Sequence, residues 1–108
     1  MNQDNPACFK TLEELTEFID FKLCEQNILK KDVFPLTCRL LKRRSKVCGM
    51  TFCLHGPRSV KSMAIWEVET NRILFYDSIG KCFHITQVQQ APTEEFLNRF
   101  SGKIGNET

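Results

Sequence analysis

The chain has 108 residues, of which 42% are hydrophobic and 26% are charged, and its formal net charge is +2. This length and composition are those of one ordinary globular domain, and they exclude collagen, coiled-coil arrays and chains that are disordered throughout. A domain of this size buries roughly two thirds of the surface that its unfolded chain exposes, so its core needs no metal or disulfide. A net charge this small does not indicate any particular partner.

The first residues and the cysteines bear on the cellular compartment. Residues 1–6 do not have the basic region and apolar stretch of a signal peptide. No apolar run approaches the ~18 residues that span a bilayer, so we expect no membrane association and a location in the cytoplasm or nucleus. Glutathione opposes disulfides there, so six reduced thiols are expected: Cys8, Cys24, Cys38, Cys48, Cys53 and Cys82.

A helix is predicted over about residues 11–28. Thr11 and Glu14 have the spacing of a capping box, in which each side chain accepts a hydrogen bond from an unpaired amide at the helix start. One apolar stripe follows at three- and four-residue spacing, as in an amphipathic helix: Leu12, Leu15, Phe18, Ile19 and Leu23.

From about residue 36 the apolar period changes from 3.6 to 2, which predicts β-strands. The first strand begins at Leu36, and the second has one apolar face formed by Cys48, Met50, Phe52 and Leu54. Further strands are predicted at about 61–69, at 72–77 and around Phe83, separated by turn residues at 56–59, 70–71 and 77–80.

The end of the chain completes the predicted fold. Thr93 is positioned to cap a second helix that carries Phe96, Leu97 and Phe100. The fold class is therefore α+β: an N-terminal helix, an antiparallel β-meander of four to five strands and a C-terminal helix, in two layers. We expect a single domain over 11–102, with an N-terminal extension over 1–10 and a disordered tail over 103–108.

The charges are distributed unevenly along the chain. Residues 1–32 hold seven acids and four bases, and residues 67–108 hold six acids and four bases. Residues 33–66 hold no acid. A hairpin in this segment is expected to gather its seven bases into one basic patch: Arg39, Lys42, Arg43, Arg44, Lys46, Arg58 and Lys61.

Such a patch fits an anionic partner, either a nucleic acid such as RNA or an acidic or phosphorylated protein segment. On that interpretation the protein is a non-enzymatic binding module. The same bases also fit a solvated edge strand that is protected against aggregation. An alternative binding surface is apolar and contains Trp66, Phe75 and Tyr76; it would serve dimerisation or a protein complex, with the basic region only solvated.

Two Cys-x-His pairs, Cys53 with His55 and Cys82 with His84, supply the ligand types that zinc accepts. Strand alternation places all four on the outward face, because four apolar neighbours are expected to face the core: Phe52, Leu54, Phe83 and Ile85. In a simple meander these strands lie three intervals apart, roughly 14 Å, whereas zinc ligands lie within about 4 Å of one another. We therefore predict no metal site. No cofactor fingerprint is present and no sequence signature supports a Cys/His pair as nucleophile and base, so we also predict no cofactor and no catalytic residues.

Overall fold

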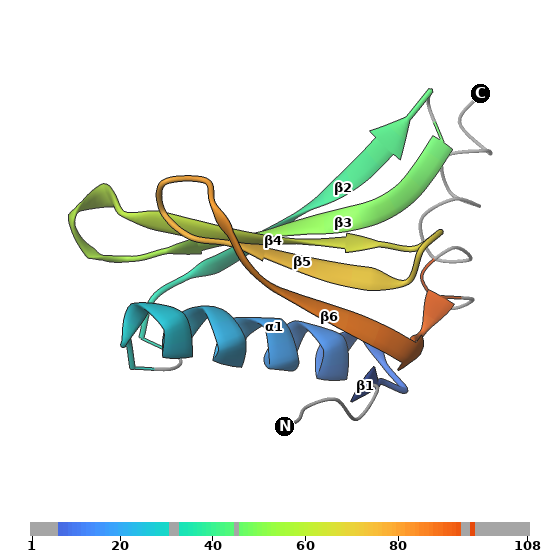
Figure 1. Cartoon of the computed structure of the whole chain (residues 1–108), viewed down its shortest axis with the longest axis horizontal. Helices are drawn as coiled ribbons and strands as arrows, with labels where there is room; N and C mark the ends of the chain where they lie inside the picture. Colours follow the sequence, from blue (N-terminus) through green and yellow to red (C-terminus); the bar gives the residue numbers. More distant parts are fainter. Residues whose placement is uncertain (1–6, 31–32, 45, 94–95, 97–108) are drawn as a thin grey trace.

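A computed structural model describes residues 7–30, 33–44, 46–93 and 96. Figure 1 shows one sheet with a helix along one of its faces, and a hairpin end that extends beyond the helix. The elements, in chain order, are β1 (Ala7–Cys8), α1 (Leu12–Asn27), β2 (Leu36–Arg43), β3 (Lys46–His55), a short 3-10 helix (Pro57–Ser59), β4 (Lys61–Glu67), β5 (Arg72–Tyr76) and β6 (Cys82–Gln90).

The predicted class, α+β, is confirmed, but the number of elements is not. The described residues form one α-helix and six strands, where the sequence predicts two helices and four to five strands. The predicted second helix falls largely on residues 94–95 and 97–102, which lie outside the described residues, as does the tail at 103–108. At its start, the backbone N–H of Phe96 donates to the Pro92 carbonyl at 2.9 Å.

The strands have the order β1-β6-β5-β4-β3-β2. Strands β2 to β6 form an antiparallel meander. Strand β1, however, pairs with β6 in parallel, so the sheet is mixed rather than a plain meander. Two residues are too few to show an alternating pattern, which explains why the sequence does not reveal β1.

Helix α1 begins and ends close to its predicted bounds. The Thr11 hydroxyl accepts a hydrogen bond from the Glu14 amide at 3.1 Å, and the Glu14 carboxylate accepts one from the Lys10 amide at 2.7 Å. The helix ends where Ile28 adopts a left-handed backbone conformation, with φ of 54°. Of the helices in the described ranges, none is long and apolar enough to cross a membrane.

The core lies between α1 and one face of the sheet. It includes fully buried side chains from β3, β4 and β5, and the Phe96 ring packs on Trp66 with centroids 5.0 Å apart. Both Trp66 and Phe75 are fully buried in this core, so the apolar surface predicted from Trp66, Phe75 and Tyr76 is wrong. Because strand neighbours point to opposite faces, Tyr76 is the one member of that set on the other side of the sheet.

Candidate binding surface on the β2–β3 hairpin

Six of the seven bases of residues 33–66 form two groups instead of the single patch that the sequence predicts, and Arg39 lies within β2. Arg58 and Lys61 lie at the connection between β3 and β4. The other group lies at the opposite end of β3, a strand of ten residues, and a strand of that length spans about 30 Å. We name its four members, which surround the β2–β3 turn, the basic hairpin end: Lys42, Arg43, Arg44 and Lys46.

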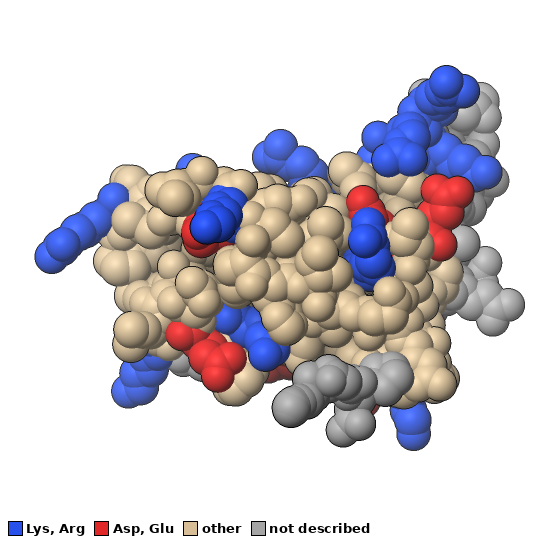
Figure 2. Space-filling model, viewed as in Figure 1, with Lys and Arg blue, Asp and Glu red and all other residues tan. Residues whose placement is uncertain are grey.

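All four side chains of the basic hairpin end are exposed, and so is Arg39 further back on β2. Figure 2 shows Lys and Arg atoms gathered over this part of the molecule, at the upper right. In the described ranges the ion pairs join Lys22 to Glu25 and Arg72 to Glu67, and none involves the basic hairpin end. Its charges are therefore available to a partner.

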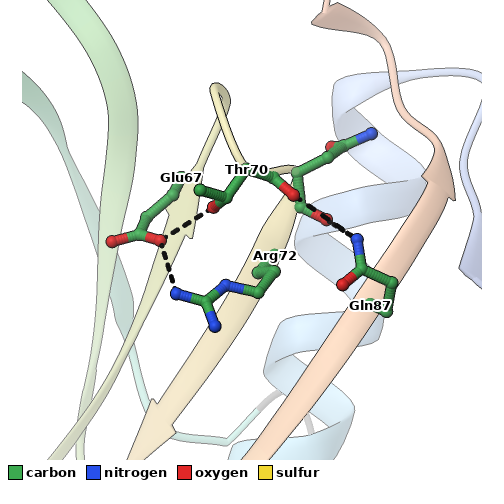
Figure 3. A network of polar contacts seen from close by, with 5 residues as sticks. Glu67, Thr70, Arg72 and Gln87 are labelled. Atoms are coloured by element: carbon green, nitrogen blue, oxygen red, sulfur yellow. Dashed lines mark hydrogen bonds and ion pairs between the residues drawn. The ribbon is translucent and has the colours of Figure 1, made fainter.

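Two acids lie beside the basic hairpin end, although they follow it by more than twenty residues in the sequence. Glu67 and Glu69 line a small hollow of about 60 Å³ together with Arg43. The Arg72 guanidinium donates to the Glu67 carboxylate at 3.3 Å and the Thr70 hydroxyl donates to it at 2.8 Å (Figure 3). The charge of Glu67 is thus matched by Arg72, and exposed Glu69 offsets only part of the basic charge nearby.

Hydrogen bonds hold the neighbouring β4–β5 turn in place. The Gln87 side chain on β6 donates to the backbone carbonyls of Thr70 and Asn71 at 3.4 and 3.2 Å (Figure 3). The Trp66 indole N–H donates to the Asn71 side-chain oxygen at 3.3 Å, which ties the turn to the core. The basic hairpin end therefore stands next to a turn that is fixed at several points.

The two Cys-x-His pairs do not share a face as predicted. Cys82 pairs with Tyr76 and His84 pairs with Phe75, two neighbours on β5 that point to opposite faces. The reason is a bulge, since Phe83 is an extra residue in β6 and reverses the alternation. The residue after His84, Ile85, is accordingly 49% exposed and does not face the core.

The strands of the two pairs are three intervals apart, as predicted. Cys53 and His55 lie on β3, and the His55 ring is hydrogen-bonded to the Thr37 hydroxyl at 2.9 Å. Within the described residues, no three His, Cys, Asp or Glu side chains are grouped so that they could hold a metal ion. All six cysteines lie in this part of the chain, and each is a free thiol.

His84 lies on the helix side of the sheet, where its ring packs against Phe75 with centroids 5.6 Å apart. Partial burial lowers the pKa of His84 below its usual value, the charge of Lys22 lowers it further, and Glu25 opposes this effect. The folded protein therefore favours the neutral imidazole.

Acidification is accordingly expected to destabilise the protein through His84. Between the lowered pKa of the folded state and the ordinary value of about 6.5, the unfolded chain binds more protons, so stability rises with pH. Urea unfolding at pH values about one unit above and below 6.5 tests this. The variant His84→Gln is expected to lose less stability on acidification than the wild type. An equal loss in both proteins would contradict the lowered pKa of His84 in the folded state.

Sequence reasoning missed an apolar surface on the face of the sheet opposite α1. Met63 and Ile85 are 37% and 49% exposed there, and a hollow of about 380 Å³ is lined by Cys53, Met63, Ile65 and Tyr76, among others. The signal was present, because strands β4 and β5 are apolar on both faces in the sequence. An uncovered apolar sheet face is a feature of protein interaction sites.

Comparisons of the chain with protein-family models, with curated proteins and with solved structures found no match.

Proposed function

We propose that the protein is a non-enzymatic binding module that contacts an anionic partner through the basic hairpin end. The observation that carries this proposal is the exposure of four bases within residues 42–46, at a hairpin end where the described acids leave them unpaired. The hairpin end also extends beyond the helix, so a partner reaches it without obstruction from α1 (Figure 1).

Two kinds of anionic partner share the required chemistry. Arginine guanidinium groups form bidentate hydrogen bonds with phosphates and carboxylates, and lysines add positive charge. A nucleic acid and an acidic or phosphorylated protein segment both present such groups. Arg58 and Lys61 contribute to the same contact only if the partner spans the length of β3, because they lie at its other end.

The apolar face opposite α1 supports a second candidate function, a protein–protein contact or dimerisation. Two observations favour it: exposed Met63 lines the hollow together with Tyr76, and Ile85 is exposed on the same face of the sheet. On this candidate the basic hairpin end is only solvated.

A charge-reversal experiment separates the two candidates. The variant Arg43→Glu, Arg44→Glu, Lys46→Glu is expected to bind anionic probes at least about tenfold more weakly than the wild type, because three charge-assisted contacts are lost. The probes are a single-stranded oligouridylate and a polyglutamate peptide, measured by fluorescence anisotropy at low salt. If phosphates are bound, the slope of log affinity against log salt is expected to fall by roughly 0.7 for each lost contact.

The matched control reverses three exposed bases at the opposite end of the sheet: Arg58→Glu, Lys61→Glu and Lys81→Glu. It changes the net charge by the same amount, so the two variants differ in the position of the charge. Neither is expected to unfold, since exposed substitutions usually change stability by less than about 0.5 kcal/mol each. If both variants bind the probes equally weakly, the loss of affinity is caused by the net charge and not by the position of the bases. If the wild type binds neither probe, the proposed function is ruled out.

A further inference from the structure

Strand β2 forms an edge of the sheet. Its one partner in the described part of the chain is β3, and the other side of β2 is not paired with any strand there. The strand is eight residues long and contains no proline. The irregularity in the β2–β3 pairing lies on β3, where Cys48 is the extra residue between the partners of Leu41 and Lys42, so β2 itself stays regular.

The pairing shows which backbone groups of β2 are free. The His55 amide donates to the Pro35 carbonyl at 2.9 Å, and the carbonyls of Arg39 and Leu41 accept hydrogen bonds from side chains on β3. Odd-numbered residues of β2 therefore direct their backbone groups toward β3. Since alternate residues of an antiparallel strand face opposite sides, the N–H and C=O groups at the free edge belong to Leu36, Cys38 and Leu40.

The side chains along this edge define what an added strand would meet. On the face opposite α1, β2 presents Arg39, Leu41 and Arg43, of which Leu41 is half-buried and the two arginines are exposed. Directly opposite residues of neighbouring strands have Cβ atoms about 4.5–5.5 Å apart, so opposite charges pair there. The complementary strand has acids opposite Arg39 and Arg43 and an apolar residue opposite Leu41.

We propose that the edge of β2 accepts an extended acidic segment of another protein as an added strand. The segment has two acids four positions apart with an apolar residue midway, and its end lies against the basic hairpin end. This inference rests on the proposed function and specifies the partner. Added strands of this type are held by main-chain hydrogen bonds and selected by alternate side chains.

The edge favours this occupant over two others. A nucleic acid cannot supply the alternating N–H and C=O groups that match those at 36, 38 and 40. A second copy of this chain could supply them through its own β2, but β2 contains no acid, so Arg39 and Arg43 would remain unpaired.

Backbone methylation of a peptide tests the inference on the full chain. The probe is a labelled threonine-rich peptide with two glutamates four positions apart and a leucine midway. Two forms are N-methylated at alternate residues, one on each set. Because the N–H groups of only one set face β2, one form is expected to bind at least about tenfold more weakly, and the other within about threefold of the parent peptide. The form that loses affinity shows whether the added strand is parallel or antiparallel to β2.

A charge swap tests the side-chain register. The variant Arg39→Glu, Arg43→Glu is expected to lose the glutamate peptide and to bind its lysine counterpart, whereas the control Arg58→Glu, Lys61→Glu keeps the original preference. If both methylated peptides bind as the parent does, or if only oligouridylate binds, the inference is overturned while the proposed function stands. A wild-type dimer that dissociates in Cys38→Pro would also overturn it, because β2 would then serve a second copy. If no anionic probe binds, both proposals fail.

Discussion

Replacing Trp66 with alanine is expected to lower the free energy of unfolding by about 3–5 kcal/mol, the usual cost of truncating a buried tryptophan. The side chain is fully buried and packs against Phe96, and its indole N–H donates to the Asn71 side chain. Alanine leaves a cavity and removes the donor for Asn71. Urea unfolding followed by circular dichroism measures the loss, since the variant removes the single tryptophan of the chain.

Tyr76 provides the matched control, because it is an aromatic residue of the same sheet that is half-buried on the opposite face. Tyr76→Ala is expected to cost clearly less, since a half-buried ring loses less packing. A small loss for Trp66→Ala, below about 1 kcal/mol, would contradict the core assignment. Such a small loss would instead support the prediction from the sequence that Trp66 belongs to a binding surface.

The helix was predictable because its signals are local. The caps at Thr11 and Ile28 stand just outside the observed helix, and the apolar stripe between them is uninterrupted. Capping and periodicity involve residues within one or two turns of one another, so they can be recognised without knowledge of the tertiary structure.

The face of β6 was not predictable for the opposite reason. The alternation of Cys82, His84 and Ile85 is interrupted by the bulge at Phe83, which inserts one residue against β5. No glycine or proline marks this position in the sequence. One extra residue reverses every later assignment along the strand, so His84 faces the helix and Ile85 faces outward.

The acid-free segment correctly predicted a set of exposed bases, but it did not show which of these bases lie close together. Strand β3 separates the turns at its two ends by its full length, so Arg58 lies far from Arg43 although both belong to the acid-free segment. Strand pairing has the converse effect, because it brings Glu67 and Glu69 of the acidic segment beside Arg43. The basic hairpin end is therefore smaller than the sequence predicts.

Gly49 on β3 is expected to tolerate no side chain. A Cβ atom there would lie 2.1 Å from the backbone oxygen of Trp66 on β4 and 3.4 Å from the Leu41 side chain on β2. The first distance is far below van der Waals contact, and the obstacle is backbone, which cannot rotate away. The variant Gly49→Ala must therefore push β3 and β4 apart.

Overpacking of this kind usually costs about 1–3 kcal/mol, and we expect Gly49→Ala to reach at least the upper value because the strand pairing itself is disturbed. Urea unfolding measures the loss, with Thr51→Ala on the same strand as a control that is expected to cost less than about 1 kcal/mol. A change below about 0.5 kcal/mol would mean that β3 and β4 do not approach so closely.

The same variant links the fold to the binding surface. Gly49 lies between the partners Leu41 and Glu67, next to the bulge at Cys48 from which the basic hairpin end projects. Displacing β3 from β4 shifts the β2–β3 hairpin relative to Glu67 and disturbs the pairing of β2 with β3 beside the turn, while every charge is retained. Anionic probes are therefore expected to bind folded Gly49→Ala more weakly than the wild type, and unchanged affinity would show that the charges of the turn act without the register of the sheet.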